Sequence, residues 1–173
     1  TMMIFFMNAD EQIYGRYGGR VADGSDLKHS LPGLKFAMKA AIDAHCEKKP
    51  RTEPKKKPIY IRELQSARAV RGCVHCHNVK EILHKELERT NKWTRDEVWR
   101  YPPPANVGFE LNVEQGNQVK RVVKNSAAAQ LGLLSGDLID EIGDRRVRSF
   151  GDAQYALDKS PKKGVVKVEW QRG

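Results

Sequence analysis

Prolines limit where helices can form in this chain and divide it into three regions. Residues 50–58 contain three prolines and residues 102–104 are three in a row, so no helix can run through either stretch. We therefore expect a first region at residues 1–49, a second at residues 50–104 and a third at residues 105–173. With 173 residues, the chain has room for one ordinary domain or two small ones.

The first region has the pattern of a β-hairpin followed by a helix. Residues 3–7 form an apolar run typical of a buried strand, residues 8–11 supply turn formers and residues 12–17 favour a returning strand. Residues 34–45 carry apolar side chains at helical spacing, with Pro32 near the first turn. A hairpin and a helix bury little surface alone, so we expect another part of the protein to complete their core.

The third region alternates short apolar strands with two helices. Such a pattern is typical of a small β-sandwich or barrel, and it places the whole chain in the α+β class. Strands are expected at residues 107–113, 118–123, 138–142 and 165–170, a short hairpin closes at residues 146–150, and helices are expected at residues 126–130 and 152–159.

The second region contains Cys73, Cys76 and His77 in the spacing C-x-x-C-H. On a helix, residues i, i+3 and i+4 share one face, and we expect a helix over residues 73–91. Two thiols on one face can add to the two vinyl groups of a haem, while the imidazole reaches the iron. We therefore predict one covalent haem c on the two cysteines, with His77 as the proximal iron ligand. Gly72 leaves room for the flat ring.

Two other chemistries compete for these thiols. Cys73 and Cys76 could form a thioredoxin-type redox pair. They could also bind zinc, although no second Cys or His pair in the sequence has zinc-finger spacing. Neither alternative needs a histidine directly after the second cysteine, so haem is the favoured interpretation. Cys46 is left without a partner and is expected to be a buried thiol.

The distal iron ligand has two candidates. His29 lies in an irregular loop, and His45 lies on the apolar stripe of the expected first-region helix. His84 is two turns beyond His77, roughly 10 Å along one helix, so it is expected to contact the haem edge instead. No methionine follows Met38, which argues against the fold of a small class I cytochrome. An open sixth position would favour ligand sensing or peroxide chemistry.

The third region resembles a bacterial PDZ domain. Residues 126–139, SAAAQLGLLSGDLI, are similar to the family run S-x-A-x-x-A-G-L-x-x-G-D-x-I, with Leu131 in place of the usual small residue. PDZ domains bind an extended peptide as an added strand. The same side chains are also compatible with core positions, above all Leu157. The resemblance implies a carboxylate-binding loop at Val107, Gly108, Phe109 and Glu110, and a peptide groove lined by Leu111, Ala153 and Leu157.

The first region resembles the closing β-hairpin and last helix of a thioredoxin fold, through residues 5–10, 13–18 and 34–45. The leading β-α-β half and its redox cysteines are not in the sequence, so thioredoxin catalysis is not implied. The whole arrangement is similar to bacterial envelope proteins that join a thioredoxin-like part, one C-x-x-C-H motif and a PDZ domain. This resemblance implies that the chain begins inside a larger precursor.

The composition of the sequence limits the classes of binding partner that we expect. The net charge of +9 favours acidic partners, and residues 47–58 alone carry six Lys or Arg and two Glu, as is typical of a solvated linker. No nucleic-acid motif accompanies this charge, so no nucleic-acid partner is expected. No apolar run approaches the roughly 18 to 20 residues of a spanning helix, so no transmembrane segment is expected.

The expected function joins the haem to the PDZ domain. In c-type cytochromes haem is attached outside the cytoplasm, which implies a periplasmic or other extracytoplasmic location. We expect a monohaem cytochrome-like protein for electron transfer or redox sensing, whose PDZ domain selects a redox partner protein or a C-terminal peptide. A peroxidase-like enzyme with an open distal site and a scaffold with a structural haem are the alternatives. Folding is expected to depend on haem, and a homo-oligomer would supply further core.

Overall fold

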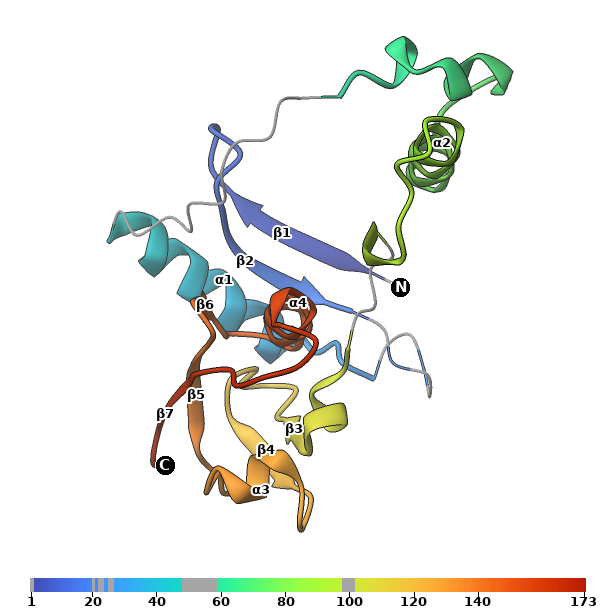
Figure 1. Ribbon diagram of the computed structural model, residues 1–173. Coiled ribbons are helices and arrows are strands. Elements are labelled where there is room, and N and C mark those ends of the chain that lie inside the picture. Colours follow the sequence, from blue (N-terminus) through green and yellow to red (C-terminus); the bar gives the residue numbers. More distant parts are fainter. Residues whose placement is uncertain (1, 20, 22–23, 25–26, 48–58, 98–101) are drawn as a thin grey trace. The chain divides into compact units, whose positions relative to one another are not determined.

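The structure is a computed structural model that describes the chain in four main stretches and two single residues, and these divide into two compact units (Figure 1). The first unit joins residues 1–53 to residues 100–173, and the second unit consists of residues 54–99. Most of the expected basic linker lies outside the described residues. The described residues are 2–19, 21, 24, 27–47, 59–97 and 102–173.

The first unit begins with the expected hairpin of β1 (Met3–Met7) and β2 (Ile13–Gly18), which pair antiparallel. The turn is held by Asn8, whose Oδ1 accepts the N–H of Asp10 at 3.0 Å and of Gln12 at 2.9 Å. An asparagine that bonds to the backbone after it is a common way to close a turn. The predicted strand-turn-strand is therefore confirmed.

Helix α1 (Leu31–Cys46) follows the hairpin and starts three residues before the expected helix. The difference arises at its N-terminus, where the Ser30 hydroxyl accepts the Gly33 N–H at 3.0 Å and caps the helix. Pro32 lies in the first turn, where it loses no helical hydrogen bond.

The buried face of α1 is made of alanines. Ala37, Ala41 and Ala44 are buried and α1 packs against β2, whereas Met38 and Ile42 are 43% and 59% exposed. Met38 and Ile42 belong to the apolar side chains whose helical spacing predicted a buried stripe over residues 34–45, and at these two positions the prediction was wrong. Small residues replace them because the helix lies close to a strand that contains glycine.

The rest of the first unit is a small mixed domain. Its strands form two sheets, β3-β4 and β6-β5-β7, and the core lies between these strands and α4. The expected strand at residues 107–113 is shortened, because Pro104 starts a 3-10 helix in which Val107 lies. The elements are η4 (Pro104–Val107), β3 (Phe109–Leu111), β4 (Val119–Val122), α3 (Ala127–Gln130), β5 (Leu138–Ile142), β6 (Arg145–Arg146), α4 (Phe150–Lys159) and β7 (Val168–Gln171).

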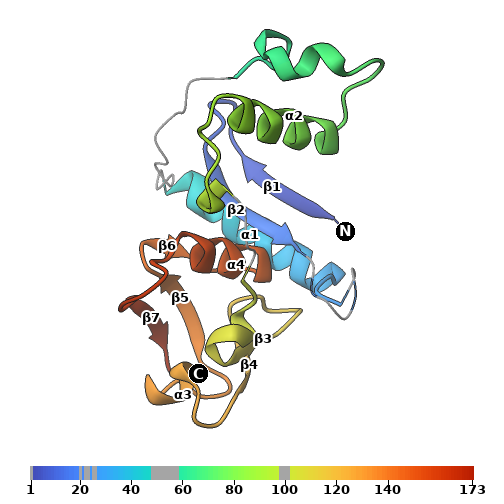
Figure 2. The same cartoon turned by 45° about the vertical axis from the view of Figure 1, so that its right-hand side comes forward.

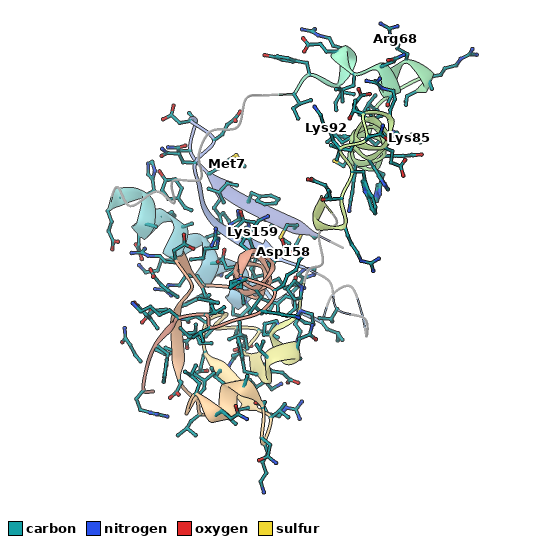
Figure 3. The ribbon with its side chains drawn as sticks, in the orientation of Figure 1. Met7, Arg68, Lys85, Lys92, Asp158 and Lys159 are labelled. Carbon is teal, nitrogen blue, oxygen red and sulfur yellow. The ribbon has the colours of Figure 1, made fainter. Side chains whose placement is uncertain are left out.

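Helix α4 lies between the hairpin and the strands of this domain (Figure 2). The Asp152 Oδ1 accepts the Arg16 N–H at 3.0 Å, and the Ser149 hydroxyl donates to the Arg16 carbonyl. The Arg16 guanidinium lies 3.6 Å from the centre of the Tyr155 ring. Helix α4 ends at Asp158 and Lys159, whose charged atoms are 3.6 Å apart (Figure 3).

The second unit contains η1 (Ile61–Glu63), η2 (Gln65–Ala69), α2 (Cys76–Arg89) and η3 (Arg95–Glu97). Ile82 is 1% exposed and anchors α2, which packs against η2. The exposed side of α2 carries charge pairs such as Lys85 to Glu81, at 2.8 Å (Figure 3). Among the described residues, every helix is too short or too polar to cross a bilayer.

Replacing Ser30 with alanine should lower the free energy of unfolding by about 1–2 kcal/mol. The substitution removes the cap of α1 together with the 3.2 Å bond from the Ser30 hydroxyl to the Val113 carbonyl. Urea unfolding followed by circular dichroism measures this loss. The matched control is Ser135→Ala, which removes an exposed hydroxyl and should change stability by less than about 0.5 kcal/mol. Equal losses in the two variants would contradict the capping role of Ser30.

Candidate functional site

Strand β3 presents an unpaired backbone edge. In the described part of the chain it pairs with β4 alone. The Gly108 carbonyl accepts the Val123 N–H at 2.8 Å, and the Asn112 N–H donates to the Gln118 carbonyl at 2.8 Å. Because successive residues of a strand turn their polar groups to opposite sides, the amides of residues 109 and 111 face away from β4. We call this unpaired side of Phe109–Leu111 the β3 edge.

The side chains beside the β3 edge are mostly committed to the core. Phe109, Leu111 and Ala153 are buried in one apolar cluster, and Leu157 is partly buried against it. Their burial is what the core interpretation expected. What β3 offers to a peptide is its backbone, together with the half-buried side chain of Glu110.

Gly108 forms the end of η4 and the start of β3. Its φ of +95° is in the left-handed region, and a Cβ there would collide with the side chain of Ser126. Its N–H donates to the Ala105 carbonyl at 3.1 Å. Val107 and Gly108 therefore form a tight turn before β3, in which the Gly108 amide is already engaged, and the carboxylate-binding role of residues 107–110 stays a prediction.

Glu110 carries the charge nearest to the β3 edge. The Arg121 guanidinium lies 2.5 Å from its carboxylate, and this hydrogen bond holds the pKa of Glu110 below its usual value. The positive charges of Lys28 and Lys120 lower the pKa further. Lys28 belongs to the segment before α1, more than 80 residues away in sequence. Sequence reasoning missed Lys28, because no local pattern marks a contact across that distance.

An edge strand and a helix that share one apolar cluster are a feature of domains that bind extended peptides by strand addition, although they are not confined to such domains. Residues 118–172 match the family model of the PDZ domain, so this protein contains a PDZ domain there, as the sequence resemblance indicated. The match includes β4 through β7, while β3 and residues 107–111 precede it. Neither a curated protein nor a solved structure matches the chain.

The cysteine motif lies in the second unit at the start of α2. Cys76 is the first residue of the helix and His77 the second, whereas Cys73 precedes it. The expectation that all three lie on one helical turn was therefore wrong. The helix begins later because the Asn78 Oδ1 accepts the His75 N–H at 3.0 Å and fixes the first turn.

The motif residues fit a covalent haem in their chemistry and their accessibility. Cys73, Cys76 and His77 are all exposed, and both cysteines are free thiols. A Cβ placed on Gly72 would meet no atom within 4 Å. No packing has to be undone before these groups react. Among the described residues, no three His, Cys, Asp or Glu side chains form a ready metal site.

The two candidate distal ligands belong to the first unit. The sequence predicted His45 on the apolar stripe of α1, but in the structure this side chain is exposed in the last turn of the helix. Its Nδ1 lies 3.0 Å from the Tyr14 hydroxyl. The His29 Nε2 is buried, and its ring centre lies 6.0 Å from that of Tyr17, so His29 is not a solvated loop residue. His77 belongs to the second unit, and the identity of the distal ligand stays a prediction.

Two further sequence expectations concern single residues. Cys46 was expected to be buried, but it is exposed at the last residue of α1. The position ends the helix beyond the alanine face, which explains its exposure. The His84 ring stacks on Trp93, with ring centres 5.6 Å apart, and its Nε2 lies 3.3 Å from Glu88.

The second unit should lose stability in acid through Glu86. Its carboxylate accepts hydrogen bonds from Arg89 and from the Ser66 hydroxyl and N–H, which lower its pKa to about 2. Because the folded pKa lies below the ordinary value of 4.5, this stabilisation is complete above about pH 4.5 and is lost as the pH falls towards 2.

The helix signal of the wild-type chain, followed by far-UV circular dichroism during thermal unfolding, measures this effect. The stability difference between wild type and Glu86→Gln should shrink as the pH falls through this window. The exposed Glu63 supplies the matched control, since Glu63→Gln should leave the pH dependence unchanged. A constant difference between wild type and Glu86→Gln from pH 6 to 2 would refute the role of this carboxylate.

Proposed function

We propose that this protein binds the extended C-terminal segment of a partner protein along the β3 edge of its PDZ domain. The observation that carries this proposal is the pair of backbone amides, at Phe109 and Leu111, that face away from β4. An added strand would pair with them and extend the β3-β4 sheet. Edge strands left unpaired are otherwise an aggregation hazard, and an added strand would satisfy the unpaired amides of β3.

The energetics suit a modest affinity. Each backbone hydrogen bond contributes about 0.5–1.5 kcal/mol net, and a short peptide makes only a few along a three-residue strand. The core positions of Phe109, Leu111 and Ala153 leave few side-chain contacts for the peptide. We therefore expect dissociation constants in the micromolar range or weaker. A dissociation constant of about 1 μM corresponds to a binding free energy of about −8 kcal/mol.

A library of fluorescein-labelled octapeptides with free C-termini tests this proposal by fluorescence anisotropy with the full chain. The best binder should lose at least tenfold in affinity when the amide nitrogens on one side of its backbone are methylated, because these pair with the β3 edge. Methylation of the alternate nitrogens, which point away, is the matched control and should change affinity little.

The contradicting results are equally clear. Equal effects of the two methylation patterns would exclude strand addition, and a library without any binder would exclude peptide binding altogether. A further comparison with C-terminally amidated peptides measures how much the carboxylate contributes, given that the Gly108 amide is engaged by Ala105.

A second proposal concerns the motif at the start of α2. Cys73, Cys76 and His77 are exposed and close in sequence, and their spacing is that of c-type haem attachment. We propose that the two thiols hold one haem c covalently, that His77 is its proximal ligand and that the protein works in the periplasm or a similar compartment. A bound haem supplies one-electron redox chemistry. The PDZ domain would then hold the electron donor or acceptor nearby.

Expression together with cytochrome c maturation machinery should yield coloured protein whose pigment survives acid acetone. The variants Cys73→Ala and Cys76→Ala should lose covalent attachment, because each thioether needs its own thiol. Cys46→Ala removes the third exposed thiol and should retain the pigment. Colourless wild-type protein, or a Cys46→Ala variant that loses haem as the others do, would overturn the assignment.

The spectrum of such a preparation separates the possible roles of the haem. A low-spin haem that does not bind carbon monoxide supports electron transfer and argues for a distal ligand such as His29 or His45. A five-coordinate haem that binds carbon monoxide supports the peroxidase-like alternative, with its open sixth position. A haem that never changes redox state under physiological reductants supports the scaffold alternative.

A further inference from the structure

One end of the β3 edge is closed by residues from the segment between β2 and α1. The pocket there is lined by Leu111 at the end of β3, Val113 just after it, Phe150 at the start of α4, Tyr17 of β2 and Lys28 of that segment. The hollow measures about 10 Å³, scarcely the volume of one water molecule. A peptide that lies along β3 therefore meets this segment at the end of the strand.

The closure is built from tight contacts. The Ser30 hydroxyl donates to the Val113 carbonyl at 3.2 Å. A side chain on Gly33 of α1 would collide with the same carbonyl, so the helix start lies directly against the loop after β3. The Tyr17 hydroxyl bonds to both the N–H and the carbonyl of Ser30, each at 2.7 Å, and holds the segment in place.

Lys28 lies at this closed end and brings a positive charge to it. It is half-buried, and its ammonium nitrogen is 5.4 Å from the centre of the Phe150 ring. It also lies near enough to Glu110 on β3 for the two charges to interact. Lys28 thus faces both elements between which a strand-adding peptide would lie. The carboxylate of Glu110 is paired with Arg121, at 2.5 Å, and not with Lys28. The ammonium group of Lys28 can therefore also attract an acidic group of a peptide.

We infer that Lys28 is a specificity-determining residue, which selects partner segments that carry an acidic side chain where the peptide reaches the closed end of β3. The inference rests on the proposed peptide binding. It assigns part of the recognition to a residue outside the PDZ domain proper, because Lys28 precedes the matched residues by 90 positions. An Asp or Glu there gains an opposite charge that is partly shielded from water.

The test uses the full chain and pairs of fluorescein-labelled octapeptides with free C-termini. The members of a pair differ by Glu against Gln at one position, which is moved through the four positions before the last. At one position the Glu peptide should bind wild type roughly twofold to fivefold more tightly than the Gln peptide. The preference should weaken as salt is raised, because the pair is not fully buried.

Two variants locate the effect. Lys28→Gln should abolish the preference for Glu, and Lys28→Arg should keep it. The matched control is Lys120→Gln, which removes an exposed charge that also acts on Glu110 but lies on β4, and it should leave the preference intact. Urea unfolding of each variant checks that the fold is unchanged.

The outcomes distinguish this inference from the function on which it rests. Peptides that bind without a preference for Glu at any position, or a preference that survives in Lys28→Gln, overturn the role of Lys28 while leaving peptide binding in place. Loss of the preference in Lys120→Gln to the same degree as in Lys28→Gln also overturns it. The absence of binding by any peptide would overturn both proposals.

Discussion

Two backbone groups of Arg16 join the two ends of the chain into one folded body. The Arg16 N–H donates to Asp152 and its carbonyl accepts from Ser149, at the start of α4. These groups are buried, and buried backbone groups left without partners cost about 1–3 kcal/mol each. The hairpin therefore depends on α4 to satisfy these buried backbone groups. In turn, the hairpin covers the side of α4 that faces away from the PDZ core.

The packing of the hairpin against α4 explains why one end of the β3 edge is closed. Docking of the hairpin on α4 brings the segment before α1 against residues 111–113, and this segment supplies Lys28 to the same place. The proposed peptide-binding edge would thus be bounded at one end, and would gain a positive charge there, from a part of the chain outside the residues that match the PDZ domain. The contacts that stabilise the first unit would therefore also set the selectivity that we propose.

The sequence predicted local structure well where short-range chemistry decides it. The Asn8 turn, Pro32 in the first helical turn and the glycine-rich PDZ run all act within a few residues. It failed at Met38 and His45, because helical spacing does not say which side of α1 faces β2. It also failed to show Lys28 and Arg16, whose contacts join residues more than 80 positions apart. The start of α2 was missed because Asn78 fixes it through a single hydrogen bond.

The order of the units along the chain has one more consequence. The chain leaves the first unit after residue 53 and returns to it at residue 100, so the second unit, with Cys73 and Cys76, is an insertion. A protease that cuts once within this insertion produces two fragments, and each still contributes to the first unit. The nicked protein would stay together under native conditions and come apart only in denaturant.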